Sequence, residues 1–288
     1  MTQAHAGQKA GQRGSLYVVA TPIGNLKDIT LRAIDVLAAV DRVAAEDTRI
    51  TAGLMAHLGL AKPIFSVHEH NEQAGARKIV EALKQGESVA LVTDAGTPGV
   101  SDPGARVVAA VRAAGLRVVP VPGPSALTAA WSVAGLSDPH LLWYGFLPAK
   151  TAARRSLLTS LKGLPYALAF YESPHRIAAT LADFATLFEP ERTLVVAREL
   201  TKLFEEIHVC SVAEGLAWLK QDPQRSRGEF VLIVSGAAAQ VADEGEARRV
   251  LGILLQELPA SQAARLAAQI TGMTRKALYA LALELQVR

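Results

Sequence analysis

Three segments of the chain gather glycine, proline and small polar residues directly after apolar runs. They are residues 21–25, 93–104 and 121–126, with the sequences "TPIGN", "TDAGTPGVSDPG" and "VPGPSA". Glycine lacks a β-carbon and lets the backbone approach a ligand closely, whereas proline fixes the path of the chain. The pattern therefore predicts loops of defined conformation that bind a small molecule. The second loop is also longer than most connections between a strand and a helix.

Missing motifs narrow the kind of ligand. The first apolar run is not followed by G-x-G-x-x-G, and the chain contains no G-x-x-x-x-G-K-[ST]. The first motif holds the pyrophosphate of a dinucleotide, and the second holds the phosphates of a nucleoside triphosphate. The sequence therefore favours neither NAD nor ATP.

A metal site is not expected either. The chain has one cysteine, Cys210, so it can form neither an intramolecular disulfide nor a multi-cysteine metal site. His68 and His70 flank Glu69, but no third ligand is evident nearby. We predict no metal cofactor.

Composition leaves room for a polyanionic partner. The formal net charge is +3 and the pI is near 9.0, which permits such a partner without requiring one. No apolar run reaches the roughly 18 residues that span a bilayer, and residues 1–14 contain no hydrophobic segment suited to secretion. We expect a cytoplasmic protein whose residues 1–14 form a disordered tail.

The elements that must position the loops follow from the spacing of apolar residues. In residues 15–135, short apolar runs alternate with helical patterns, which is typical of βαβ units around a parallel sheet. The carboxyl ends of such strands meet at one edge, where ligands bind. Residues 136–238 predict a second, mixed α/β domain with hairpin elements. The pattern in residues 245–288 predicts a mildly basic helical appendix. The predicted fold class is therefore α/β, with two α/β domains followed by this appendix.

Eight motifs carry a resemblance to a known family. In chain order they are "VVATPIGNLKDITLRA", "AAEDTR", "LVTDAGTPGVSDPG", "VPGPSA", "GFLP", "YESPHR", "ARELTK" and "RGEFV". Their order and spacing resemble the tetrapyrrole methylase superfamily, and in particular its members that modify small-subunit ribosomal RNA. The resemblance covers roughly residues 15–236. It implies two α/β domains that face each other across a cleft.

The resemblance also implies a function. Members of this superfamily use S-adenosylmethionine, and the branch in question adds a methyl group to the 2′-oxygen of a cytidine ribose in the decoding region. It implies that the partner is small-subunit ribosomal RNA or the assembled small subunit, and that the protein is a homodimer. No membrane contact is implied.

Ten residues match the cofactor motifs of the family. The resemblance implies cofactor-binding roles for Pro22, Gly24, Asp94, Gly96, Thr97, Pro98, Ser125, Ala126, Tyr171 and Gly228. Free backbone N–H groups at a helix start near Ser125 suit the carboxylate of the methionyl group. Three alternatives stay open, because Ser125 could simply cap its helix, Asp94 could only shape a turn, and Tyr171 could belong to the core.

Charged and polar residues at strand ends are candidates for the reaction itself. Asn25, Arg49, His175 and Arg176 are predicted to contact the substrate, and Asp47, Glu199 and Lys202 are candidates for the group that accepts the proton of the hydroxyl. A carboxylate, or a lysine with a lowered pKa, can take that proton. The simpler interpretation of Asp47 is a helix cap.

Two other functions remain open at this stage. One is a tetrapyrrole or other small-molecule methylase with the same fold, which would have no need of the helical appendix. The other is a non-catalytic RNA-binding protein that uses residues 261–285 as a helix-turn-helix. The glycine-rich loops argue against the second alternative, and the eight motifs together argue against the first.

Overall fold

The computed structural model describes residues 14–238 and 244–286. They belong to two compact units, one ending at Gly236 and the other running from Ala237 onward. Of the tail predicted for residues 1–14, all but Gly14 lies outside the described residues. Among the described residues, no helix is both long and apolar enough to cross a bilayer.

The first sheet of the large unit is entirely parallel. Its order is β3-β2-β4-β1-β5. The strands are β1 (Ser15–Val19), β2 (Arg42–Ala45), β3 (Ile64–Ser66), β4 (Val89–Val92) and β5 (Arg117–Val121). Because helices cover both faces, the central strand β4 is apolar along its whole length, and each of its residues is buried.

Four helices cover this sheet, two on each face. They are α1 (Leu31–Ala39), α2 (Thr48–His57), α3 (Glu72–Lys84) and α4 (Ala105–Ala113). One apolar cluster joins the sheet to α1 and α2, and another joins it to α3 and α4. Helix α1 begins after Thr30, whose hydroxyl accepts a hydrogen bond from the backbone N–H of Ala33 at 3.1 Å.

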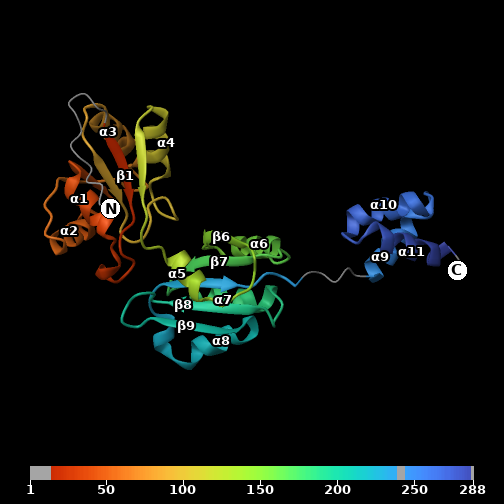
Figure 1. Ribbon diagram of the computed structural model, residues 1–288. Coiled ribbons are helices and arrows are strands. Elements are labelled where there is room, and N and C mark those ends of the chain that lie inside the picture. The colour runs from red at the N-terminus through yellow and green to blue at the C-terminus, as the bar shows by residue number, and fades with distance from the viewer. Residues whose placement is uncertain (1–13, 239–243, 287–288) are drawn as a thin grey trace. The chain divides into compact units, whose positions relative to one another are not determined.

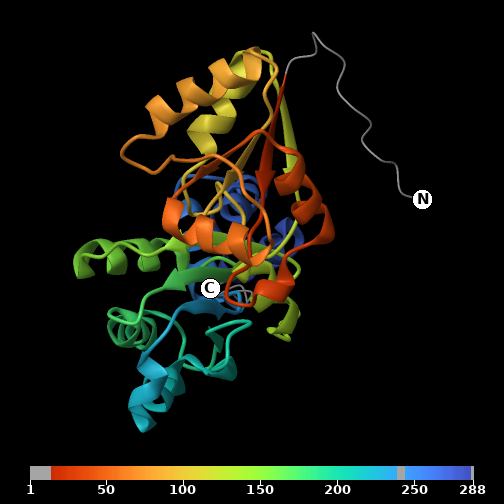
Figure 2. The same ribbon diagram turned by 90° about the vertical axis from the view of Figure 1, so that its left-hand side faces the viewer.

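The second sheet is mixed, with the order β6-β7-β10-β8-β9. Its strands are β6 (Leu141–Phe146), β7 (Ala167–Glu172), β8 (Thr193–Arg198), β9 (Glu206–Ser211) and β10 (Phe230–Val234). Only the β6–β7 pair is parallel, and β8 and β9 form an antiparallel hairpin. The two sheets can be followed in Figures 1 and 2, the first from red to yellow and the second from green to light blue.

The helices of the second sheet divide unequally between its faces. On one face lie α6 (Thr151–Leu161), α7 (Ile177–Leu187) and α8 (Val212–Gln221), around a cluster centred on Phe170 and Phe184. On the other face, α5 (Ala126–Val133) packs against β7, β8 and β10 through Ala130. Helix α5 falls within the range 15–135 expected for the first domain, yet it packs against the second sheet. The domain ranges given above stay a prediction.

The small unit consists of helices in the described part of the chain. They are α9 (Glu244–Leu254), α10 (Ala260–Thr271) and α11 (Arg275–Gln286), which share a core of alanine, valine and leucine. Helix α10 ends at Gly272, whose φ of 71° is the left-handed conformation that glycine adopts at little cost.

Candidate active site

Hydrogen bonds fasten the three glycine-rich loops to one another. Thr21 and Gly96 form an isolated antiparallel bridge, in which each backbone N–H donates to the other residue's carbonyl, at 2.8 and 3.0 Å. The Thr97 hydroxyl donates to the Pro124 carbonyl at 3.1 Å. The loops after β1, β4 and β5 therefore form one structure at the carboxyl edge of the first sheet, as the sequence predicted.

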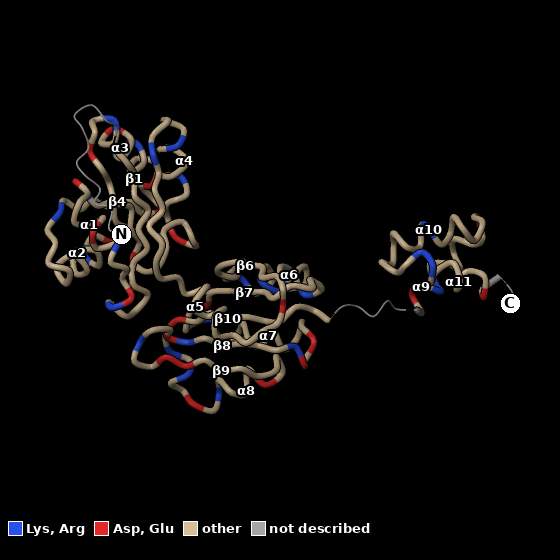
Figure 3. Tube along the Cα trace, in the orientation of Figure 1, with Lys and Arg blue, Asp and Glu red and all other residues tan. Residues whose placement is uncertain are grey.

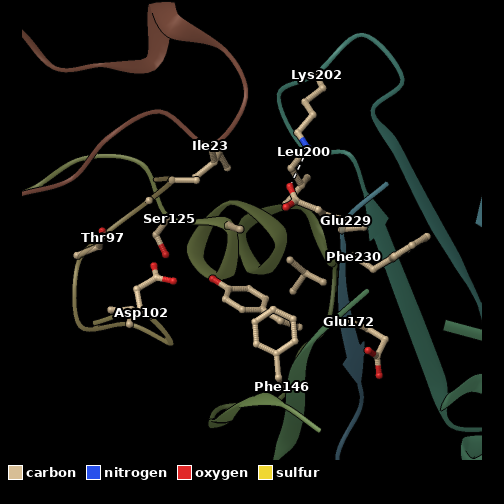
Figure 4. Close-up of a pocket in the computed structure, with 17 residues that line it drawn as sticks. Ile23, Thr97, Asp102, Ser125, Phe146, Glu172, Leu200, Lys202, Glu229 and Phe230 are labelled. Carbon is tan, nitrogen blue, oxygen red and sulfur yellow. Dashed lines mark hydrogen bonds and ion pairs between the residues drawn. The ribbon is translucent and has the colours of Figure 1, made fainter. Parts of the chain in front are cut away.

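A cavity opens between this structure and the second sheet. The first half of the unit contributes Ile23, Ala95, Gly96, Thr97, Val100, Asp102, Ser125 and Ala126. The second half contributes Phe146, Tyr171, Glu172, Ala197, Leu200, Lys202, Glu229, Phe230 and Val231. In Figure 4, Thr97, Asp102 and Ser125 lie on one side, Phe146 lies below, and Lys202 and Glu229 lie on the opposite side.

The loop after β4 suits close contact between backbone and ligand. Gly96 has a φ of +81°, in the left-handed region. A β-carbon built there would lie 3.5 Å from Ile23 Cγ2, so the position is open towards the cavity. The backbone conformation, rather than crowding, is therefore what requires glycine at this position.

The start of α5 supplies backbone donors on the same side, one of which, the N–H of Leu127, bonds with Tyr171. Ser125 occupies the N-cap position, but its side chain makes no capping hydrogen bond. The first N–H groups of the helix are therefore not capped by this side chain and can bind an anion such as a carboxylate. Burial raises the pKa of Tyr171, and the Asp102 carboxylate adds to that rise. Tyr171 lines the cavity, so it is not confined to the core.

Lys202 is held between two carboxylates at the far side of the cavity. Its Nζ lies 2.8 Å from Glu199 Oε1 and 2.7 Å from Glu229 Oε2. Burial alone would lower the pKa of Lys202, but the two carboxylates outweigh burial and raise it. The ammonium is therefore favoured at neutral pH, which makes Lys202 poorly suited to accept a proton.

Glu199 is held by its ion pair with Lys202. Burial acts to raise its pKa, but the hydrogen bond from Lys202 and the backbone at Glu229 lower it overall. Gly228, predicted to touch the cofactor, does not line the cavity. A β-carbon built on it would lie 2.4 Å from Glu199 Cγ, so this glycine leaves room for Glu199.

Asp47 and Arg49 pair with each other outside the cavity. Asp47 caps α2 by accepting a hydrogen bond from the Arg49 backbone at 2.8 Å, and its carboxylate meets the Arg49 guanidinium at 2.5 Å. These hydrogen bonds lower the pKa of Asp47 to about 2. Asp47 therefore caps α2, as the simpler interpretation of the sequence predicted. Its lowered pKa makes it a poor proton acceptor.

The remaining residues predicted to contact the substrate do not line the cavity, and two of them bond to nearby parts of the chain. The Asn25 side chain accepts a hydrogen bond from the Lys27 backbone and caps a short 3-10 turn (Leu26–Asp28). Arg176 donates to the Leu147 carbonyl at 2.5 Å and lies 3.3 Å from Glu172. His175 is exposed and does not line the cavity. None of the three points a free polar group into the cavity.

Two predicted residues lie beside a second cavity. Pro22 and Asp94 line it together with Leu26 and Ile50. Asp94 accepts a hydrogen bond from the Asp47 backbone at 2.9 Å, so it also ties together the loops after β2 and β4. Pro98 lines neither cavity. Gly24, in contrast, lies against Lys202.

Several lining residues were not predicted. Asp102, Ile23, Phe146, Leu200 and Glu229 all line the main cavity. Asp102 stands inside the loop that the sequence singled out, so a search for every carboxylate of that loop would have found it. Phe146 stands in the motif "GFLP", whose aromatic residue was the available signal.

Metal and thiol chemistry find no support in the described residues. No group of three or more histidine, cysteine, aspartate or glutamate side chains is arranged to hold a metal ion within residues 14–238 and 244–286. Cys210 lies on β9 and is not part of the cavity. Burial, followed by the charge of Glu214, raises its pKa to about 11.

Comparisons with known proteins agree with this architecture. Residues 15–215 match the family described as Tetrapyrrole (Corrin/Porphyrin) Methylases. Residues 241–286 match the RsmI C-terminal HTH domain. Uroporphyrin-III-C-methyltransferase from Thermus thermophilus has the same fold, with a TM-score of 0.57, 20% identity and coverage of 77% of this chain and 94% of that chain. The structure of the methyltransferase CobJ gives a TM-score of 0.59 at 22% identity, over 78% of this chain and 95% of that one.

The fold and the cavity between the two sheets define a methylase of the tetrapyrrole methylase type, as the motifs predicted. A relative from Escherichia coli O157:H7, named ribosomal RNA small subunit methyltransferase I, is 50% identical over 95% of this chain and 96% of its own. The protein of the same name from Xylella fastidiosa strain Temecula1 is 52% identical over 92% of this chain and 98% of its own. The chain belongs to the family of ribosomal RNA small subunit methyltransferase I.

Proposed function

We propose that this protein methylates small-subunit ribosomal RNA with S-adenosylmethionine, and that the methyl group goes to the 2′-oxygen of a cytidine in the decoding region. Its relatives are named for methylation of small-subunit ribosomal RNA. A solved neighbour with the same fold is complexed with S-adenyl homocysteine. Small ribosomal subunits are found in the cytoplasm, where we expect the protein to act.

One observation carries the proposal for the cofactor. The cavity joins a left-handed glycine, Gly96, to the uncapped start of α5 and to the apolar side chains of Ile23, Val100 and Leu200. A glycine loop admits close contact, a helix start binds a carboxylate, and apolar walls bind an adenosyl group. The residues present therefore fit S-adenosylmethionine.

The reaction is a displacement in which alignment supplies most of the rate. When bound, S-adenosylmethionine would supply an electrophilic methyl group for the ribose oxygen to attack, with S-adenosylhomocysteine as the leaving group. The second sheet and the joined loops hold the reactants in line and exclude bulk water. The proton of the hydroxyl is released to solvent, and Asp47 and Glu199, with lowered pKa values, and Lys202, which is already protonated, are poorly suited to hold it.

Basic residues of the small unit support binding to RNA. Arg265, Arg275 and Lys276 are exposed, and no ion pair is found for them within residues 14–238 and 244–286. Phosphate contacts by such side chains give affinity that falls as salt rises. Residues of both signs are interspersed along the chain in both units (Figure 3), so we infer RNA binding from these three side chains and not from the net charge of the small unit.

A homodimer is part of the proposal. Leu203 and Phe204 are 90% and 66% exposed, and Val209 on the edge strand β9 is 51% exposed. Exposed apolar side chains of this size suit burial against a second copy. Light scattering coupled to size exclusion tests this, and a monomer at micromolar concentration would contradict it.

The main test measures where labelled methyl groups go. Purified protein is incubated with radiolabelled S-adenosylmethionine and either small ribosomal subunits, naked small-subunit RNA or uroporphyrinogen. We expect incorporation into one of the two RNA substrates and none into the tetrapyrrole. Incorporation into uroporphyrinogen alone would favour the small-molecule alternative, and no incorporation together with RNA binding would favour a non-catalytic protein.

A further inference from the structure

Asp102 differs from the other carboxylates that line the main cavity. Glu172 accepts hydrogen bonds from the Ser173 backbone and the Thr180 hydroxyl, at 2.8 and 2.6 Å, and Glu229 pairs with Lys202. Asp102 has neither a hydrogen bond nor an ion pair with any residue of the described ranges 14–238 and 244–286. In Figure 4 its carboxylate points towards the Ser125 hydroxyl, across the space that the cavity leaves open.

The surroundings of Asp102 are negative. Burial, together with the nearby carboxylates of Glu46 and Asp94, raises its pKa to about 6. Among the described residues that line the cavity, Lys202 is the only cation, and two carboxylates already hold it. A half-buried carboxylate without a partner is unfavourable until something compensates it. The site therefore favours a ligand that brings a positive charge.

The start of α5, on the same side of the cavity as Asp102, favours a negative charge. Ser125 marks the start of α5, where the first N–H groups of the helix are not capped by its side chain. Asp102 and Ser125 face each other in Figure 4. An amino-acid group carries an ammonium and a carboxylate on one carbon, so it can meet the helix start and Asp102 together. The methionyl end of S-adenosylmethionine is such a group.

We propose that Asp102 recognises the α-ammonium group of S-adenosylmethionine and so selects ligands that carry an amino-acid end. This inference rests on the proposed use of that cofactor. It assigns Asp102 to binding and leaves the transfer of the methyl group to alignment. A carboxylate-to-ammonium contact is charge-assisted, and such contacts are about twice as strong as neutral hydrogen bonds.

The assignment has a consequence for pH. Asp102 binds the ammonium only when ionised, and its pKa of about 6 in the free protein means that it is protonated in more acidic solution. Cofactor affinity should therefore fall as the pH drops through about 6. Glu46, whose pKa is also raised by burial and then by Asp94, faces the same region. Tyr171, Glu172, Lys202 and Glu229 complete the titratable groups that line the cavity.

Calorimetry with three ligands tests the proposal. The ligands are S-adenosylmethionine, S-adenosylhomocysteine and methylthioadenosine, of which the last lacks the amino-acid end. Asp102→Asn keeps the shape and removes the charge. We expect it to weaken the first two ligands equally, by about 10- to 100-fold, and to leave methylthioadenosine unchanged. Glu229→Gln, a carboxylate change in the same cavity, should not discriminate among the three.

Other outcomes overturn the assignment. Weaker binding of S-adenosylmethionine alone would mean that Asp102 senses the sulfonium. Unchanged binding with slower turnover would mean that Asp102 acts on the substrate hydroxyl. If Asp102→Asn does not fold, wild-type affinity measured between pH 7.5 and 5 decides, and a level profile contradicts the proposal. If the wild-type protein binds none of the ligands, the proposed function itself fails, which is a separate result.

Discussion

Gly24 and Lys202 touch across the two halves of the large unit. A β-carbon built on Gly24 would lie 2.5 Å from Lys202 Cγ and 3.0 Å from the Thr201 hydroxyl. Lys202 is in turn fixed by Glu199 and Glu229. The loop after β1 therefore needs a glycine because it packs against the stem of a lysine that two carboxylates hold in place. This contact links the first strand of the chain to the far wall of the cavity.

Gly24→Ala should disturb this contact. The added methyl group must displace the Lys202 stem or move the loop, and overpacking of this kind costs about 1–3 kcal/mol. We expect a lower melting temperature and slower methylation of small subunits. Gly163→Ala is the matched control, because a β-carbon at Gly163 meets nothing within 4 Å. Equal behaviour of the two variants in thermal unfolding and in turnover would contradict the prediction.

Gly96→Val should abolish binding of S-adenosylmethionine in a protein that still folds. Its φ of +81° is a conformation that costs an ordinary L-residue about 1–2 kcal/mol, and relief of that strain would change the shape of the cofactor loop. Gly135→Val is the control, since Gly135 has a similar φ of +66° with open space around it and does not line the cavity. Both variants should lose stability. Only Gly96→Val should lose binding in calorimetry.

Lys202 should act as a fixed cation, not as a proton acceptor. Its raised pKa keeps it charged at neutral pH, so removal of the charge in Lys202→Met leaves Glu199 and Glu229 facing each other without compensation. We expect Lys202→Met to lose most of the turnover and Lys202→Arg to recover much of it, because arginine also pairs with carboxylates. An arginine cannot accept a proton. Equal loss of turnover in Lys202→Arg and Lys202→Met would contradict the fixed-cation role and leave the proton-acceptor role open.

The small unit should contribute affinity for RNA that depends on salt. Replacement of Arg265, Arg275 and Lys276 by alanine should weaken binding to small subunits and spare binding of S-adenosylmethionine. Each side chain that binds a phosphate in the wild type should, once it is replaced, make the slope of log K against log salt shallower by about 0.7 to 0.9. Arg249→Ala is the control, because Arg249 is exposed but paired with Glu246 at 2.7 Å. A triple variant that binds subunits as tightly as the wild type, at every salt concentration, would assign these residues another role.

The local sequence pattern was sufficient to predict the strands, helices and glycine-rich loops of the first domain. It was not sufficient to predict which residues each side chain contacts. The apolar runs and the Thr30 cap are encoded within a few residues, so β1 to β5 and the start of α1 could be predicted. The strand order, the packing of α5 on the second sheet and the bulge between Trp143 and Gly145 depend on contacts between distant residues.

The same limit explains the site residues that were assigned differently. Asp47 and Arg49 look like free charges at a strand end, yet they satisfy each other and cap a helix. Asp102 looks like one more loop carboxylate, and what distinguishes it is the lack of a partner among the described residues, which only a folded structure reveals. A single sequence shows which side chains are charged, but it does not show which residue each charged side chain pairs with in the fold.

We expect the new methyl group on a ribose oxygen rather than on a base carbon. Methylation of a base carbon commonly needs a cysteine nucleophile, and the chain has only Cys210, which lies on β9 away from the cavity. Its pKa of about 11 keeps it a thiol at neutral pH. We therefore expect Cys210→Ala to retain full activity, with Ser125→Ala as a comparison variant that lines the cavity. The RNA product should resist alkaline cleavage at one cytidine, because a methylated 2′-oxygen cannot attack the neighbouring phosphate. Nucleoside mass spectrometry after complete digestion locates the methyl group, and a methyl group on the base would contradict attack by a ribose hydroxyl.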